Sequence, residues 1–245
     1  MSDGGLQGEG AGLRDLPQVL VDRIVRAALE TMKPKEAARL AITSASLRAA
    51  IASHRMYWRS FSAKHAFLPS QENQAENVLR QAPEGDWWFS WYMQRMHTRW
   101  LVRRTVQRFL DFLGPQSAAA FKMGASLIDL DDFESKTRFG LPWQVWELYR
   151  YRNGQAGGRE RAVFVGFSRL LPLHEILDAH GLQQLTRPFC LRNSEDDDTM
   201  VPITTEFEGR KRFYAGESGS IYLGTDFQNV KVADSLVAWL QKWLI

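Results

Sequence analysis

The sequence predicts an α+β protein: an N-terminal unit of three short helices, followed by a domain in which helices flank an antiparallel sheet. From Leu13 to about Phe67, apolar residues recur only at helical spacing. After Asn153-Gly154 the apolar period changes from about 3.6 residues to two, which is the spacing of strands. The length of 245 residues accommodates one or two domains. We therefore expect a disordered Gly-rich tail at 1–12, a helical unit at 13–67, a linker and connecting helix at 68–98, and an α+β domain at 99–245.

The N-terminal unit is predicted from three amphipathic runs. Their apolar-face positions are Leu16, Leu20 and Ile24, then Leu40, Ser44, Leu47 and Ile51, then Trp58 and Phe61. Asp15 can cap the first helix, with Pro17 in its first turn, and Lys33-Pro34 separates the first helix from the second. Three short helices within about 50 residues make a very small core, so a unit of this size usually needs a partner.

The middle of the chain predicts three further helices. Residues 87–113 form a long helix, or two helices with a break, and Gly114-Pro115 ends this helical run. Its apolar stripe consists of Val102, Val106, Phe109 and Leu113. The next helix has a Ser126 cap, acidic residues in its first turn and a stop at Gly140. Pro142 then opens a third helix, whose Val145, Trp146 and Tyr149 we expect to pack against the sheet.

The C-terminal part predicts an antiparallel sheet followed by a helix. The segments with strand character are "AVFVGF", "MVPITTEF", "KRFYAG" and "SIYLG", and "GESG" joins the last two as a hairpin turn. Asn153-Gly154 supplies left-handed residues for the turn into the first strand, so we interpret 141–155 as a structural joint. In the final helix, "VADSLVAWLQKWLI", one face carries Val232, Leu236, Trp239, Leu240 and Trp243.

The chemistry-bearing residues predict neither a catalytic site nor a metal or cofactor site. The five histidines lack H-x-x-x-H spacing, and the single cysteine, Cys190, cannot build a Cys-rich zinc site. The acidic run "SEDDD" lacks the pattern of a calcium loop, and "NGQAGG" lacks the spacing of a phosphate loop. We therefore expect no cofactor and no enzymatic activity. No apolar run reaches membrane-spanning length and no signal peptide is apparent, which with one cysteine favours the cytoplasm, the nucleus or both.

One basic helix face leaves two interpretations open. Arg99 and Arg103, and Arg104 and Arg108, form i, i+4 pairs near Trp100. Such a face can bind a nucleic-acid backbone. It can also be a solvated face whose arginines cover or pair with neighbouring side chains, which is far commoner. The net charge of only +3 favours the second interpretation, and we expect no nucleic-acid partner.

The N-terminal runs resemble an F-box. Leu16-Pro17 matches the opening Leu-Pro of that motif, "VLVDRIVRAAL" its aliphatic helix, "LAITSASLRAAI" its second helix, and Trp58 its closing tryptophan. The match departs from the family where a Trp-Arg pair is typical, because Leu47-Arg48 stands there. The resemblance implies binding to a Skp-type adaptor. The candidate adaptor-binding residues are Leu16, Pro17, Leu20, Ile24, Leu40, Leu47, Ile51 and Trp58.

The segments "GASLIDLDDFE" and "FGLPWQVWELYRYRNGQ" resemble the signature of the SUKH superfamily, which includes cell-wall regulators and immunity proteins. The residues that carry this resemblance are Gly124, Ala125, Glu134, Leu141, Pro142, Leu148, Tyr149, Asn153, Gly154 and Gln155. An F-box followed by a SUKH-like domain implies the substrate-recognition subunit of an SCF-type ubiquitin ligase. The adaptor would connect it to a cullin and a RING subunit, and the SUKH-like domain would bind a target protein that the sequence does not name. The alternative is a non-catalytic SUKH-type binding or regulatory protein outside any ligase.

Overall fold

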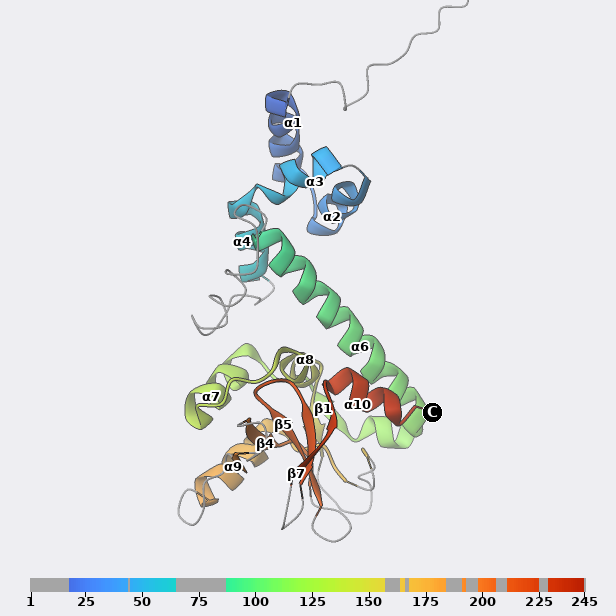
Figure 1. The fold of residues 1–245 in the computed structure, drawn as a ribbon. Helices are drawn as coiled ribbons and strands as arrows, with labels where there is room; N and C mark the ends of the chain where they lie inside the picture. The colour runs from blue at the N-terminus through green and yellow to red at the C-terminus, as the bar shows by residue number, and fades with distance from the viewer. Residues whose placement is uncertain are drawn as a thin grey trace, which may run out of the picture. The chain divides into compact units, whose positions relative to one another are not determined.

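The computed structural model confirms the α+β class (Figure 1). It describes residues 18–43, 45–64, 87–156, 164–165, 168–183, 191–192, 198–205, 211–224 and 229–244. Within these ranges there are nine helices and two antiparallel sheets. The chain divides into two compact units, Met1–Met96 and His97–Ile245, and the boundary falls inside the long helix α6. The predicted tail at 1–12 and most of the predicted linker, 68–86, lie outside the described residues.

Among the described residues, the N-terminal unit has four helices before α6, one more than the sequence predicts. They are α1 (Gln18–Thr31), α2 (Pro34–Thr43), α3 (Ala45–Ala52) and α4 (Arg55–Lys64). The predicted second helix is divided, because α2 ends at Thr43 and α3 packs back on it, with Arg48 Nε donating to the Ala41 carbonyl at 3.2 Å. Thr and Ser, the residues at 43 and 44, are weak helix formers, which favours a break there. The break at Lys33-Pro34 is confirmed, and the Lys33 N–H donates to the Glu36 carboxylate at 3.0 Å.

Helix α6 (Trp87–Ala119) is the long helix that the sequence predicts. The chain leaves the helical conformation at Gly114, whose φ is 80° and ψ 167°, and resumes it from Pro115. The stop at Gly114-Pro115 is therefore an interruption, after which a short helical segment continues to Ala119. Val102, Val106 and Phe109 are buried, as expected for the apolar stripe of this helix. Among the described residues, no helix has the length and apolar content required to cross a bilayer.

Two shorter helices follow, α7 (Leu127–Thr137) and α8 (Trp143–Tyr151). Ser126 caps α7 as predicted, in a capping box with Asp129. The predicted stop at Gly140 is wrong, because α7 already ends at Arg138, which adopts the left-handed conformation with φ 56°. A hydrogen bond of 2.9 Å from the Leu141 N–H to Glu134 Oε1 holds the connection from α7 to α8.

The strands form two antiparallel sheets. The two-stranded sheet pairs β1 (Phe121–Met123) with β2 (Arg152–Gln155). The five-stranded sheet consists, in sequential order, of β3 (Leu191–Arg192), β4 (Thr199–Pro202), β5 (Arg212–Gly216), β6 (Ile221–Gly224) and β7 (Asn229–Ala233). The predicted "GESG" hairpin joins β5 to β6, with the Gly216 N–H donating to the Ser220 carbonyl at 3.0 Å. Figure 1 shows α7, α8, α9 and α10 grouped around these strands.

Several predicted boundaries in this unit are wrong. Asn153-Gly154 lies inside β2 rather than in a turn, and only Gly154 has a positive φ, of 71°. The described part of "AVFVGF", Phe164 and Val165, forms a bend in which the Phe164 N–H donates to the Ser168 carbonyl. Val232 belongs to β7, so the last helix, α10 (Leu236–Lys242), begins after a Ser235 cap.

Helix α9 (Leu173–Gln183) was not predicted from the sequence, and it follows directly on Pro172. The core of this unit combines helix and sheet residues. Trp239 of α10 packs against Phe213 of β5, with ring centroids 4.8 Å apart, and against Phe164 at 5.7 Å. The Val237 N–H donates to Gln144 Oε1 of α8 at 3.0 Å, which fixes α10 to α8.

Candidate protein-binding surface

The N-terminal unit exposes large apolar side chains on α1 and α2. Leu20, Ile24 and Leu40 are 43%, 48% and 38% exposed. The opposite face of α1 is buried, with Val21 and Val25 in the core. Ile24 is therefore exposed, although the next residue in the sequence, Val25, is buried.

A cavity of about 110 Å³ opens beside these side chains. Its lining comes from α1, α2, α3 and the residue that follows α1, and consists of Ile24, Val25, Ala28, Leu29, Met32, Leu40, Leu47 and Ile51. Four of the predicted adaptor-binding residues, Ile24, Leu40, Leu47 and Ile51, are therefore brought together around one cavity. Because every lining side chain is apolar, the cavity suits an apolar side chain of a partner better than water. We call Leu20 together with these eight residues the apolar surface.

The predicted adaptor-binding residues differ in how far the structure exposes them. Leu16 and Pro17 lie outside the described residues. Ile51 and Trp58 are buried, and Trp58 Nε1 donates to the Ile51 carbonyl at 2.8 Å. The Trp58 ring also packs against Phe89 and Tyr92 of α6, with centroids 4.9 and 5.3 Å away. Trp58 therefore holds α3, α4 and the start of α6 together.

Two titratable side chains near the turns of this unit are partly buried. Burial raises the pKa of Tyr57 to about 12, and its hydroxyl donates to the Met32 carbonyl at 3.1 Å. Burial, followed by the positive charge of Arg26, lowers the pKa of His54. Both shifts favour the neutral forms, so α4 is linked to the end of α1 without a buried charge.

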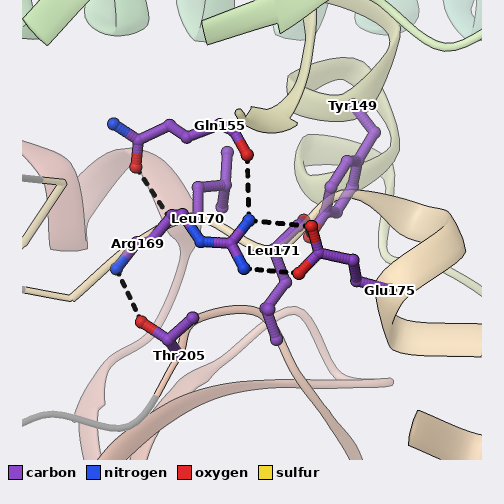
Figure 2. A network of polar contacts seen from close by, with 7 residues as sticks. All are labelled: Tyr149, Gln155, Arg169, Leu170, Leu171, Glu175 and Thr205. Atoms are coloured by element: carbon purple, nitrogen blue, oxygen red, sulfur yellow. Dashed lines mark hydrogen bonds and ion pairs between the residues drawn. The ribbon is translucent and has the colours of Figure 1, made fainter. Parts of the chain in front are cut away.

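Tyr149 and Gln155, two of the residues that carry the SUKH resemblance, belong to a polar network around β2 (Figure 2). The hydroxyl of Tyr149, whose pKa is raised by burial, donates to the Leu171 carbonyl at 3.0 Å. Gln155 accepts twice, because its Oε1 receives the Leu170 N–H at 3.0 Å and its carbonyl receives Arg169 Nη1 at 2.9 Å. These bonds join the end of α8 and β2 to the segment that precedes α9.

Arg169 completes this network. Its guanidinium forms a two-pronged ion pair with Glu175 of α9, with Nη1 at 2.9 Å from Oε1 and Nη2 bonded to Oε2. Its backbone N–H donates to Thr205 Oγ1 at 2.9 Å (Figure 2). The hydrogen bonds from Arg169 are the main cause of the lowered pKa of Glu175. Each of the seven residues shown bonds to at least one other of the set, so the network connects parts of one domain. We call it, together with 141–155, the joint.

Other signature residues also have internal contacts. A Cβ at Gly124 would lie 1.9 Å from the Arg150 carbonyl oxygen, so only glycine fits there. The Ala125 N–H donates to the Tyr149 carbonyl at 2.8 Å. Asn153 Oδ1 accepts the Leu173 N–H at 3.0 Å and so caps the start of α9. The signature therefore describes how this domain is held together.

The polar clusters do not form a metal site within the part of the chain that the structure describes. Asp198, the last residue of the acidic run, is buried and accepts from the Ser218 N–H at 3.1 Å and the Tyr222 hydroxyl at 2.9 Å. Asp198 thus stabilises the hairpin between β5 and β6. Burial, and then the charge of Asp198, raises the pKa of the neighbouring Glu217. The rest of that acidic run and Cys190 lie outside the described residues.

The arginines of the basic helix have different environments. Arg99 pairs with Glu147 of α8 at 3.0 Å, and their side chains are only 14% and 0% exposed. Burial lowers the pKa of Arg99, Glu147 opposes that shift, and the charges of Arg103 and Arg150 add to it. Arg104 instead lies 4.9 Å from the ring of Trp100, which is 52% exposed.

Comparison with known proteins adds no family to these observations. No protein-family model matches the chain, and no curated protein matches it. The F-box and SUKH resemblances remain expectations that rest on the residues named above.

Proposed function

We propose that this protein is the substrate-recognition subunit of an SCF-type ubiquitin ligase. Its N-terminal unit binds a Skp-type adaptor, which connects it to a cullin and a RING subunit, and its C-terminal unit binds the target protein. The observation that carries the proposal is the apolar surface: Leu20, Ile24 and Leu40 stand exposed, the last two at the rim of a wholly apolar cavity. The F-box resemblance places adaptor-binding residues on the same helices.

The energetics of the unit support a partner of this kind. Fully burying an exposed Leu or Ile side chain stabilises a complex by about 1.5–3 kcal/mol. A few anchors in desolvated pockets carry most of the affinity of such interfaces, each contributing about 2 kcal/mol or more on truncation. The apolar surface provides the exposed side chains and the pocket that this mode of binding requires.

On this proposal the protein performs no chemistry of its own. It holds a bound target close to the ubiquitin-charged enzyme and so raises the effective concentration of one for the other. The internal hydrogen bonds of Tyr149 and Gln155 are consistent with a binding role, because they hold the elements of this domain in place.

Co-purification of the full chain with a Skp-type adaptor tests this proposal. The double variant Ile24→Ala with Leu40→Ala should weaken adaptor binding by at least about tenfold, because two anchors are truncated. The matched control is Leu127→Ala with Ile128→Ala, which changes the same residue types at exposed positions on α7 and should leave adaptor binding unchanged.

Two results would contradict the proposal. One is an Ile24→Ala, Leu40→Ala variant with wild-type circular dichroism that binds the adaptor as tightly as the wild type. The other is a folded wild-type protein that retains no adaptor, which would favour the alternative of a SUKH-type binding or regulatory protein outside any ligase.

A further inference from the structure

Within the described part of the chain, five arginines on α6, α8 and β2 form no ion pair with a carboxylate. They are Arg103, Arg104, Arg108, Arg150 and Arg152. Arg103 and Arg152 lie over the Tyr151 ring and Arg150 lies over the Trp146 ring, and we call these three the arginine patch. The nearby Glu147 is buried in its pair with Arg99, and Asp111 accepts from Gln107 at 2.8 Å. Although the whole chain carries a net charge of only +3, this region is strongly positive.

Tyr151 connects the two sides of the patch. Arg103 of α6 and Arg152 of β2 lie over the same Tyr151 ring, at 5.6 and 4.5 Å from its centroid. The Tyr151 hydroxyl donates to Gln107 Oε1 of α6 at 2.8 Å. Guanidinium groups from α6 and β2 therefore converge on one tyrosine that is itself fixed to α6.

The guanidinium groups are also held in place before any ligand binds. Arg150 Nη1 donates to the Ala125 carbonyl at 3.2 Å, and its guanidinium lies 5.7 Å from the Trp146 ring. Arg152 Nη1 donates to the Tyr151 carbonyl at 3.3 Å. Groups that are already positioned lose less conformational entropy on binding, which favours affinity for a complementary anion.

Partial burial strengthens the attraction of these groups for an anion. Arg103, Arg150 and Arg152 are half-buried, and the Nε atoms of Arg103 and Arg150 have no hydrogen-bond partner among the described residues. A charge interacts more strongly with an opposite charge where water is partly excluded. The patch therefore combines excess positive charge with incomplete hydrogen bonding.

We propose that the arginine patch binds a phosphorylated serine or threonine in a segment of another protein. A phosphate monoester carries about −1.5 to −2 charges at neutral pH and three acceptor oxygens, and guanidinium groups match it with paired hydrogen bonds. Convergence on Tyr151 suits one focused dianion, whereas a nucleic-acid backbone distributes its charges along a track. That this segment belongs to the ligase target rests on the function proposed above.

Fluorescence anisotropy with the full chain tests this inference. The probe is a fluorescein-labelled peptide pool with one central phosphothreonine and mixed flanking residues, compared with the same pool carrying threonine. The phosphorylated pool should bind at least about tenfold more tightly, because charge-assisted hydrogen bonds to the phosphate are lost with threonine. Arg103→Glu with Arg152→Glu should abolish that difference.

The matched control is Arg23→Glu with Arg39→Glu, which makes the same charge change at exposed positions of the N-terminal unit and should preserve the preference. If the glutamate pair unfolds the domain, Arg103→Gln with Arg152→Gln removes both charges more mildly and should give the same loss. Equal binding of the two pools by the wild type would overturn the inference. So would a preference that survives the Arg103 and Arg152 changes in a folded protein, or tighter binding of a short mixed-sequence single-stranded DNA.

Adaptor co-purification from the same preparations separates this inference from the proposed function. Equal binding of the two peptide pools by a wild-type protein that retains the adaptor overturns the phosphate site alone. A phosphothreonine preference in a protein that retains no adaptor supports the site and contradicts the ligase.

Discussion

The joint and the apolar surface use their side chains in opposite ways. In the joint, Tyr149, Gln155 and Arg169 each bind a backbone or side-chain group of the same domain. On the apolar surface, Ile24 and Leu40 remain exposed beside a cavity that only apolar side chains line. The polar groups of the joint are hydrogen-bonded within the domain, whereas the apolar surface leaves Ile24 and Leu40 partly in contact with water.

This difference shows that a distinctive sequence pattern and a binding surface need not coincide. Glu134, Tyr149 and Asn153, three of the residues that carry the SUKH resemblance, bond to backbone groups of the same domain, so they position α8, β2 and the start of α9. The residues that we propose to bind partners lie elsewhere: Ile24 and Leu40 are exposed beside the cavity, and Arg103 lies over the Tyr151 ring.

Removing the central aromatic of the N-terminal unit should have the largest effect. Trp58→Ala should lower the free energy of unfolding of this unit by about 3–5 kcal/mol, because truncating a buried tryptophan leaves a cavity. The variant also removes the donor to the Ile51 carbonyl. Native-state hydrogen exchange of α3 and α4 in the full chain measures the loss.

Trp100→Ala is the matched control, because the Trp100 ring is half exposed. It should change stability by less than about 0.5 kcal/mol. Slow exchange in α3 and α4 that persists in Trp58→Ala would show that Trp58 does not hold these helices in place.

Tight packing in the joint predicts the next largest effect. Gly124→Ala should lower the free energy of unfolding of the C-terminal unit by about 1–3 kcal/mol, because the added methyl group must displace the Arg150 backbone. Urea denaturation followed by near-ultraviolet circular dichroism measures the change. At Gly114 an added Cβ meets nothing within 4 Å, so any loss in Gly114→Ala comes from backbone strain at a φ of 80° and not from a clash. A Gly124→Ala variant as stable as the wild type would mean that the backbone near Arg150 moves easily.

Local patterns were sufficient to predict much of the fold. The helical stripe with Val102, Val106 and Phe109, the Ser126 cap and the hairpin between β5 and β6 are all present. Each depends on residues close together in the sequence, so propensity and periodicity decide it.

The elements that were missed depend on distant contacts. The cap at the start of α9 comes from Asn153, twenty residues before Leu173. Val232 continues the apolar face of α10 in sequence, but pairing with β6 places it in β7. Arg138 takes a left-handed conformation that a glycine nearby was expected to supply, and the Glu134 bond to Leu141 fixes the connection there.

The candidate surfaces were predictable only in part. The sequence identified Ile24, Leu40, Leu47 and Ile51, but which of them face outward depends on how α1, α2 and α3 pack. The i, i+4 arginine pairs were visible on α6, but their convergence with Arg152 on Tyr151 requires the folded unit. The spacing of arginines along α6 could not predict the contact of Arg103 with Tyr151 of α8 or its proximity to Arg152 of β2.

The ion pair of the joint predicts the smallest effect and a defined pH dependence. The hydrogen bonds from Arg169 lower the folded pKa of Glu175 below its ordinary value of 4.5. A depressed pKa contributes stability that is present above pH 4.5 and is lost as the pH falls through the folded value. Glu175→Gln should therefore be less stable than the wild type by about 1 kcal/mol at pH 7, and the difference should shrink below pH 4.5.

Urea denaturation of the wild type and Glu175→Gln at several pH values between neutral and acid tests this dependence. Asp132→Asn is the matched control, since Asp132 pairs with Lys136 at 2.8 Å where both side chains are largely exposed, and its loss should cost less than about 0.5 kcal/mol. The free energy of unfolding of the wild type and Glu175→Gln could differ by the same amount at neutral and acid pH. Arg169 would then stabilise the domain through its hydrogen bonds to Gln155 and Thr205. The charge on Glu175 would add nothing to stability, and the hydrogen bonds from the Arg169 guanidinium to the Gln155 carbonyl and from the Arg169 N–H to Thr205 would hold this part of the joint.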